Sequence, residues 1–132
     1  RYDTGDLAYV RPGIKCSCGR EGVQVEAIIG RHDQLLVDSN GLKIPTVNFY
    51  TLMEYFTDLV AWQLVQNDDL LIVLCVMQGL SEMRKKEVET EILMGLNSRL
   101  QNSSLTYEVK FVKSLVKIKE GKTPILVKNV QI

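Results

Sequence analysis

Two apolar runs separated by four polar residues constrain the fold of this 132-residue chain more than any other feature. The runs cover residues 59–65 and 70–77, and the residues between them read QNDD. Runs of this length, rich in Val, Leu and Ile and joined by turn-forming residues, are typical of a β-hairpin. The sequence therefore predicts two antiparallel strands here.

Helical periodicity flanks this hairpin on both sides. The first predicted helix opens at Pro45, because proline is tolerated in the first helical turn. One face of that helix is apolar at helical spacing: Phe49, Leu52, Met53 and Phe56. The second helix follows Ser81, a good N-cap residue, and ends near Asn102. Its apolar residues are four positions apart: Val88, Ile92, Leu96 and Leu100.

Shorter segments complete the predicted fold. Residues 105–111 alternate between apolar and polar, which is typical of a strand. Residues 34–37 and 42–44 flank DSNG, where Asn-Gly favours positive φ and predicts a tight hairpin. The tail from residue 117 is mixed in character and predicts no element. Hairpin, helix, strand, strand, helix and strand indicate an α+β class, with helices on a small antiparallel sheet; a ferredoxin-like domain is the nearest shape.

The first thirty residues differ from the rest in their pattern of apolar residues and glycines. Residues 7–10 and 22–29 have strand character, and the segment between them is rich in glycine. We predict a β-hairpin in residues 1–30 and an α+β domain over residues 31–132.

The charge balance argues against a nucleic-acid or membrane-surface partner. Lys plus Arg equals Asp plus Glu at 16 each, so the chain has no long-range field of one sign. The longest apolar run, residues 70–77, is far shorter than the roughly 20 residues needed to cross a bilayer. No leader segment is expected. The three cysteines are an odd number, Cys75 is expected to be a buried thiol, and we expect a cytoplasmic location.

Two motifs could bind a nucleotide, and each has a plainer alternative. Asp6, after a Thr-Gly turn, could accept hydrogen bonds from both hydroxyls of a ribose, or the segment could be only a turn. Arg31 could donate to a ribose or phosphate, and Asp33 could be a hinge between two domains. The alternative for both is an ordinary charged linker.

Two further motifs could carry catalysis or a metal. Lys122 follows a glycine and could act as a mobile cation that stabilises charge on a carboxylate and an α-phosphate, or it could belong to a solvated basic tail. The segment lacks the spacing of a phosphate-binding P-loop. Cys16 and Cys18 could form half of a tetrahedral zinc site, or they could be free thiols.

Taken in order, these motifs resemble the C-terminal part of the adenylate-forming superfamily, which contains acyl-CoA synthetases, peptide-synthetase adenylation domains and luciferases. The motifs are YDTGD, CSCGR, GRHD, the glycine at position 41 and the late Gly-Lys pair. The likeness is closest to the phenylacetate-CoA ligase branch, including its capsular-polysaccharide-biosynthesis-type relatives. It covers nearly the whole chain.

This resemblance implies an ATP-dependent ligase that uses magnesium, activates a carboxylic acid as acyl-AMP and transfers the acyl group to a thiol such as CoA. Residues 1–30 would be the last hairpin of a large N-terminal adenylation domain missing from this chain, and residues 31–132 would be the mobile lid. The isolated chain would then be inactive. The implied roles are ribose binding for Asp6 and Arg31, the hinge for Asp33, the thioester-step loop for Gly41 and the adenylation lysine for Lys122.

Some alternatives stay open at this point. The arginine that commonly follows the late Gly-Lys is absent, so Lys119 or Lys117 could be the catalytic lysine instead. A different class of function, a ferredoxin-like regulatory module that binds a small ligand, also fits the order of elements, because fold does not fix function. The Thr-Gly-Asp hairpin has no purpose in such a module, which therefore ranks second.

Overall fold

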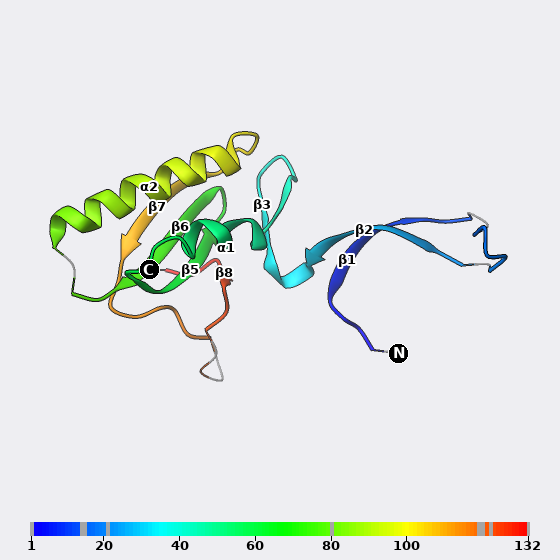
Figure 1. The fold of residues 1–132 in the computed structure, drawn as a ribbon, viewed down its shortest axis with the longest axis horizontal. Helices are drawn as coiled ribbons and strands as arrows, with labels where there is room; N and C mark the ends of the chain where they lie inside the picture. The colour runs from blue at the N-terminus through cyan, green and yellow to red at the C-terminus, as the bar shows by residue number, and fades with distance from the viewer. Residues whose placement is uncertain are drawn as a thin grey trace.

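A computed structural model of the chain describes residues 2–13, 16–20, 22–79, 81–118, 121 and 123–131, and only the backbone of Asp33. Figure 1 shows an α+β body from which a two-stranded ribbon projects. The elements in chain order are β1 (Asp6–Arg11), β2 (Gln24–Arg31), a 3₁₀ turn (His32–Gln34), β3 (Leu35–Val37), β4 (Lys43–Pro45), α1 (Val47–Met53), β5 (Leu59–Asn67), β6 (Leu70–Met77), α2 (Glu82–Leu100), β7 (Thr106–Phe111) and β8 (Leu126–Lys128). In the described part of the chain, no helix has the length and apolarity to cross a membrane.

The main sheet has the strand order β7-β6-β5-β8. β5 and β6 form the predicted antiparallel hairpin, with Leu64 opposite Val73. The prediction of a fully antiparallel sheet is wrong, because β7 runs parallel to β6 and β8 runs parallel to β5. The reason is that α2 carries the chain back along the sheet before β7 begins, as in any crossover between parallel strands.

The strand order also differs from the ferredoxin-like expectation. In a split βαβ arrangement, another strand lies between the two strands that the helix joins. Here β6 and β7 are hydrogen-bonded neighbours on either side of α2 in the chain. The tail contributes a strand that the sequence did not predict, since Leu126 pairs with Leu64 and Val127 with Val65. Three residues are too few to show a period.

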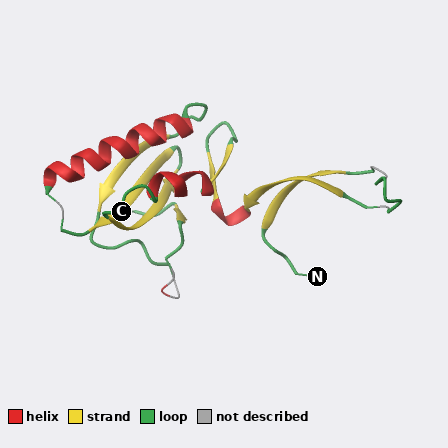
Figure 2. Cartoon of the chain, in the orientation of Figure 1, coloured by secondary structure: helices red, strands yellow, loops and turns green. Residues whose placement is uncertain are grey.

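Both helices pack on one face of this sheet (Figure 2). The predicted apolar face of α2 is confirmed, because its four residues are all buried: Val88, Ile92, Leu96 and Leu100. Ser81 caps the helix, and its hydroxyl oxygen accepts from the Arg84 N–H at 3.2 Å. α1 begins at Val47 rather than Pro45, because Pro45 still pairs with Leu35 as the last residue of β4.

The other face of the sheet is covered by the C-terminal part of the chain. Val65, Ile72, Leu74 and Val127 form a second buried cluster. Apolar residues from the segments on either side of β8 pack against it: Val112, Leu115, Val116 and Val130. Because side chains alternate along a strand, Gln63 and Val65 of β5 face this cluster, whereas Leu64 and Gln66 face the helices.

β1 and β2 form an antiparallel ribbon whose register runs from Asp6 opposite Arg31 to Arg11 opposite Gln24. Most of its apolar side chains are exposed, and Ile28 is 71% exposed. An isolated two-stranded ribbon is marginally stable in water. In this chain, therefore, the ribbon leaves an apolar surface that the α+β body does not bury.

Candidate functional site

Asp6 and Arg31 lie together where the ribbon meets the body. They are direct partners across β1 and β2. The His32 N–H donates to the Gly5 carbonyl at 2.8 Å, which closes the ribbon at this end. A Cβ placed on Gly5 would come 3.7 Å from Arg31 Nη2, so the guanidinium reaches the turn before β1. The structure thus brings together the two residues assigned to a ribose from the sequence.

The turn before Asp6 has a defined shape. Gly5 has a left-handed φ of +71°, and its N–H donates to Asp3 Oδ1 at 2.9 Å. This conformation favours glycine and places Asp6 at the first position of β1. Asp6 and Arg31 are both exposed. A carboxylate that accepts two donors, beside a guanidinium that donates several, is chemically suited to a ligand with neighbouring hydroxyls.

The 3₁₀ turn (His32–Gln34) links the ribbon to the body and contains Asp33. The residues on either side of it, Arg31 and Leu35, are both extended. Gly30, with a φ of +143°, lies against Pro45 so closely that an added Cβ would be 3.5 Å from the proline Cβ. Asp33 therefore lies at the junction of the two parts, the position that its predicted role as a hinge requires.

Gly41 lies on the loop between β3 and β4, with a φ of +79°. The predicted hairpin and its turn are present: the Gly41 N–H donates to the Asp38 carbonyl at 2.9 Å, and five residues connect the strands. Asp38 organises this loop, since its Oδ1 accepts from the N–H groups of Asn40 (3.0 Å) and Leu42 (2.8 Å). Its Oδ2 accepts from Ser104 N–H at 3.0 Å and so fastens the loop to the segment before β7.

These bonds predict a pH dependence for the Asp38 loop. The Ser104 N–H, followed by those of Leu42 and Asn40, holds the pKa of the Asp38 carboxyl below its ordinary value of 3.8. A carboxyl whose pKa is lowered by folding stabilises the protein at pH values above its ordinary pKa. This stability is lost as the pH falls through the lower pKa of the folded state. We expect Asp38→Asn to destabilise the protein near neutral pH, and the difference from wild type to shrink in acid. Urea unfolding from about pH 7 to about pH 2 measures it; a constant difference would contradict it.

The lysine predicted to be catalytic, Lys122, lies outside the described residues, as does its alternative Lys119. Lys117, the other alternative, is described and exposed. Gly121, just before Lys122 in the sequence, has a left-handed φ of +72°, and its N–H donates to the Ile118 carbonyl at 3.1 Å. A turn therefore directly precedes the predicted lysine.

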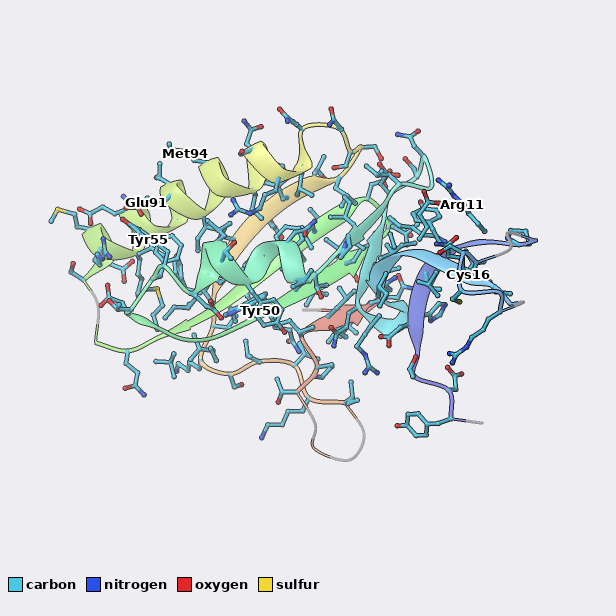
Figure 3. All side chains as sticks on the ribbon, turned by 45° about the vertical axis from the view of Figure 1, so that its right-hand side comes forward. Arg11, Cys16, Tyr50, Tyr55, Glu91 and Met94 are labelled. Carbon is cyan, nitrogen blue, oxygen red and sulfur yellow. The ribbon has the colours of Figure 1, made fainter. Side chains whose placement is uncertain are left out.

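Cys16 and Cys18 lie on the loop between β1 and β2. Figure 3 shows Cys16 away from α2, where Glu91 and Met94 are labelled. The sulfur atoms of Cys16 and Cys18 are 2.9 Å apart, and both residues are exposed. The Cys18 thiol, donating to Cys16, lowers the pKa of the Cys16 thiol below its ordinary value. Within the described ranges, no third Cys, His, Asp or Glu gathers with them. These residues therefore supply two of the four ligands that a structural zinc site needs.

The structure confirms the prediction that Cys75 is a buried thiol. Two other buried groups on the main sheet were not predicted from the sequence. Burial raises the pKa of Cys75 to about 12, so it is an inert member of the core. The missed groups are the amides of Gln63 and Gln66, which are 0% and 6% exposed. Their signal in the sequence is one amide within, and one directly after, the apolar run of residues 59–65 that predicts a strand.

No family model and no curated protein matches the chain. Solved structures do share its fold. A 2-hydroxyisobutyryl-CoA ligase in the postadenylation state aligns over 96% of this chain and 28% of its own length, with 15% identity and a TM-score of 0.59. One of the fatty acyl-adenylate ligases from E. coli and L. pneumophila aligns over 94% of this chain and 21% of its own, with 16% identity and a TM-score of 0.62.

A domain of phenylacetate-coenzyme A ligase from Bacteroides vulgatus also has this fold. The match covers 75% of this chain and 97% of that domain, with 16% identity and a TM-score of 0.54. At these identities the likeness shows the fold alone. The chain spans about a quarter of the length of the two larger ligases.

Proposed function

We propose that this chain is the C-terminal part of an ATP-dependent, adenylate-forming ligase. Residues 31–132 form its lid domain, and residues 1–30 form the last hairpin of a larger N-terminal adenylation domain. One observation carries the proposal: almost the whole chain, ribbon included, has the fold of one part of a ligase that was solved with its acyl-adenylate bound.

The exposed ribbon supports a missing domain. Val25 is 56% exposed and Ile28 71%, although these types are usually buried, and Tyr9 beside them is 64% exposed. Packing the ribbon on a neighbouring domain would remove this apolar surface from water and stabilise it. The ligand-binding alternative gains no support, because a regulatory module has no need of the ribbon.

The proposed reaction has two steps. A carboxylate oxygen of the acid attacks the α-phosphorus of ATP, with Mg²⁺ on the phosphates, and pyrophosphate leaves as acyl-AMP forms. A thiol such as CoA then attacks the acyl carbon, AMP leaves, and the thiol proton passes to solvent. Because ATP and CoA are intracellular reactants, we place the enzyme in the cytoplasm. The isolated chain, without the remainder of the site, is inactive in this proposal.

Each assigned residue has one part in these steps. Asp6 accepts from the ribose hydroxyls of the nucleotide, and Arg31 beside it supports the same ribose. Asp33 is the hinge about which the lid turns between the steps. Gly41 belongs to the lid loop of the thioester step, and Lys122 stabilises negative charge as the adenylate forms. Two further ligands from outside the described residues would be needed for zinc at Cys16 and Cys18.

The order of motifs supports the phenylacetate-CoA ligase branch and its capsular-polysaccharide-biosynthesis-type relatives. The stretch from Gly30-Arg31-His32-Asp33 through NGLKIP at residues 40–45 resembles a segment typical of that branch. On this basis we propose an aryl or acyl carboxylic acid as the substrate.

Exchange of labelled pyrophosphate into ATP by the full-length protein tests the proposal. We expect exchange that depends on an added carboxylic acid, with a panel of aryl and short acyl acids as probes. Asp6→Asn should raise the KM for ATP about 10- to 100-fold, because a hydrogen bond from a hydroxyl to a charged group is worth about 1.5–3 kcal/mol.

The matched control is Asp68→Asn, which removes an exposed carboxylate from the β5–β6 turn. It should leave the KM for ATP unchanged. Equal effects of the two variants would remove Asp6 from the ribose site. Absence of exchange with every acid would overturn the proposed reaction.

A further inference from the structure

The amide of Gln63 closes the loop that precedes β8. Its Nε2 donates to the carbonyls of Val116 (3.0 Å) and Pro124 (2.8 Å), and its Oε1 accepts from the Val116 N–H at 2.9 Å. The side chain is fully buried. One amide group thus holds both ends of residues 116–124, which are 53 and 61 positions away in sequence.

This connection adds to the packing of Leu115 and Val116 on the second buried cluster. Directly after Pro124, the Leu64 N–H donates to the Ile125 carbonyl at 2.8 Å, and the β8 ladder begins. Gln63 therefore joins both ends of the loop to β5. Replacing it with an apolar residue would leave the peptide groups of Val116 and Pro124 without their buried partner, which costs more than the bonds themselves contribute.

The amide of Gln66 does the same on the opposite face of β5. Its Oε1 accepts from the Val37 N–H at 3.2 Å, and its Nε2 donates to the Val37 carbonyl and, at 2.9 Å, to the Asp68 carbonyl. Val37 is the last residue of β3 and stands just before the loop that contains Gly41. Gln66 therefore fastens the β3–β4 hairpin to the main sheet by bonding both the N–H and the carbonyl of Val37.

We propose that Gln63 and Gln66 are positioning residues for different half-reactions of the same enzyme. Gln63 holds residues 116–124, which carry the adenylation lysine in the proposed function. Gln66 holds the β3–β4 hairpin, which carries the loop of the thioester step. The inference rests on that proposed function. Neither amide touches substrate; each acts through the backbone that it holds, and alternation along β5 assigns them to opposite faces of the lid.

The test separates the two half-reactions in the full-length enzyme. Methionine matches glutamine in length and lacks its hydrogen bonds. We expect Gln63→Met to lower acyl-adenylate formation about 10- to 100-fold, since small displacements of catalytic groups cost on this scale. Transfer from a supplied acyl-adenylate to CoA should stay within about twofold. Gln66→Met should show the reverse pattern: slower transfer and nearly normal adenylation.

Asn67 provides a matched control on the same strand. Its Nδ2 donates to the Val130 carbonyl at 2.8 Å, and its Oδ1 accepts from the Val130 N–H at 3.0 Å. This amide holds a segment beyond β8 that carries neither proposed functional loop. Asn67→Leu should therefore lower the melting temperature without changing the ratio of the two half-reaction rates.

The outcomes distinguish the inference from the proposed function. If both glutamine variants leave the ratio of the two half-reaction rates unchanged, as is expected of Asn67→Leu, the amides are merely structural and the inference is overturned. If Gln63→Met does not fold, Gln63→Asn draws the amide back by one methylene from both carbonyls without burying a charge, and the same split is expected of it. A wild-type enzyme that forms no adenylate would instead remove the proposed function.

Discussion

Replacing Lys122 by alanine in the full-length enzyme should lower acyl-adenylate formation about 100- to 1,000-fold, the usual effect of removing a group that stabilises developing charge. Transfer of the acyl group from a supplied adenylate should be nearly unchanged, because the attack of a thiol on the acyl carbon needs no cation at the α-phosphate. Single-turnover assays of the two half-reactions measure both rates separately.

Neighbouring lysines give matched controls for this experiment. Lys117→Ala and Lys119→Ala remove the same charge from the same loop, and each should change the adenylation rate by less than about threefold, as expected for a distant, screened charge. Lys122 is preferred over the other two because it directly follows Gly121, as the late Gly-Lys motif requires. Loss of adenylation in either control, with a normal Lys122 variant, would move the catalytic assignment to that lysine.

The parts of the fold that could be predicted from the sequence are those decided by local physics. α2 has a capping serine and four buried residues at helical spacing, so both its start and its buried face could be predicted. The β5–β6 hairpin is equally local, because two apolar runs flank a short polar turn. A helix start at Pro45 was wrong for a local reason too: strand pairing with Leu35 holds that proline extended.

Strand direction and order depended on contacts distant in sequence. β7 runs parallel to β6 because of the crossover through α2, and β8 joins β5 over more than fifty intervening residues. Gln63 illustrates the same limit, since an amide within an apolar run shows no partner until the chain has folded. Its partners lie 53 and 61 positions away.

For the candidate site too, local motifs could be predicted from the sequence, whereas the pairing of its residues could not. Motif order assigned Asp6 and Arg31 to one ligand, but their direct pairing depends on a ribbon with register shifts between Leu7 and Ala8 and between Tyr9 and Val10. Counting residues along two regular strands would miss this register. The role of Lys122 remains a prediction from the sequence.

Leu96→Ala should destabilise the α+β body by about 2–5 kcal/mol, the cost of deleting a buried leucine side chain and leaving a cavity. Leu96 is fully buried on α2, in the cluster that joins both helices to the sheet. Met94, two positions away on the same helix, is 68% exposed. Met94→Ala should therefore change the free energy of unfolding by no more than about 0.5 kcal/mol. Urea unfolding of both variants measures the difference.

The Leu96 variant also shows what to expect when stability is lost but the two functional loops keep their positions. Its lid is less stable, but the β3–β4 hairpin and the segment before β8 keep their hydrogen bonds to β5 whenever the lid is folded. Both half-reactions should therefore decline together as temperature populates the unfolded lid, with their ratio constant. A changed ratio in Leu96→Ala would mean that core packing alone shifts the balance between the steps, and the opposite patterns expected of the Gln63 and Gln66 variants would then lose their special meaning.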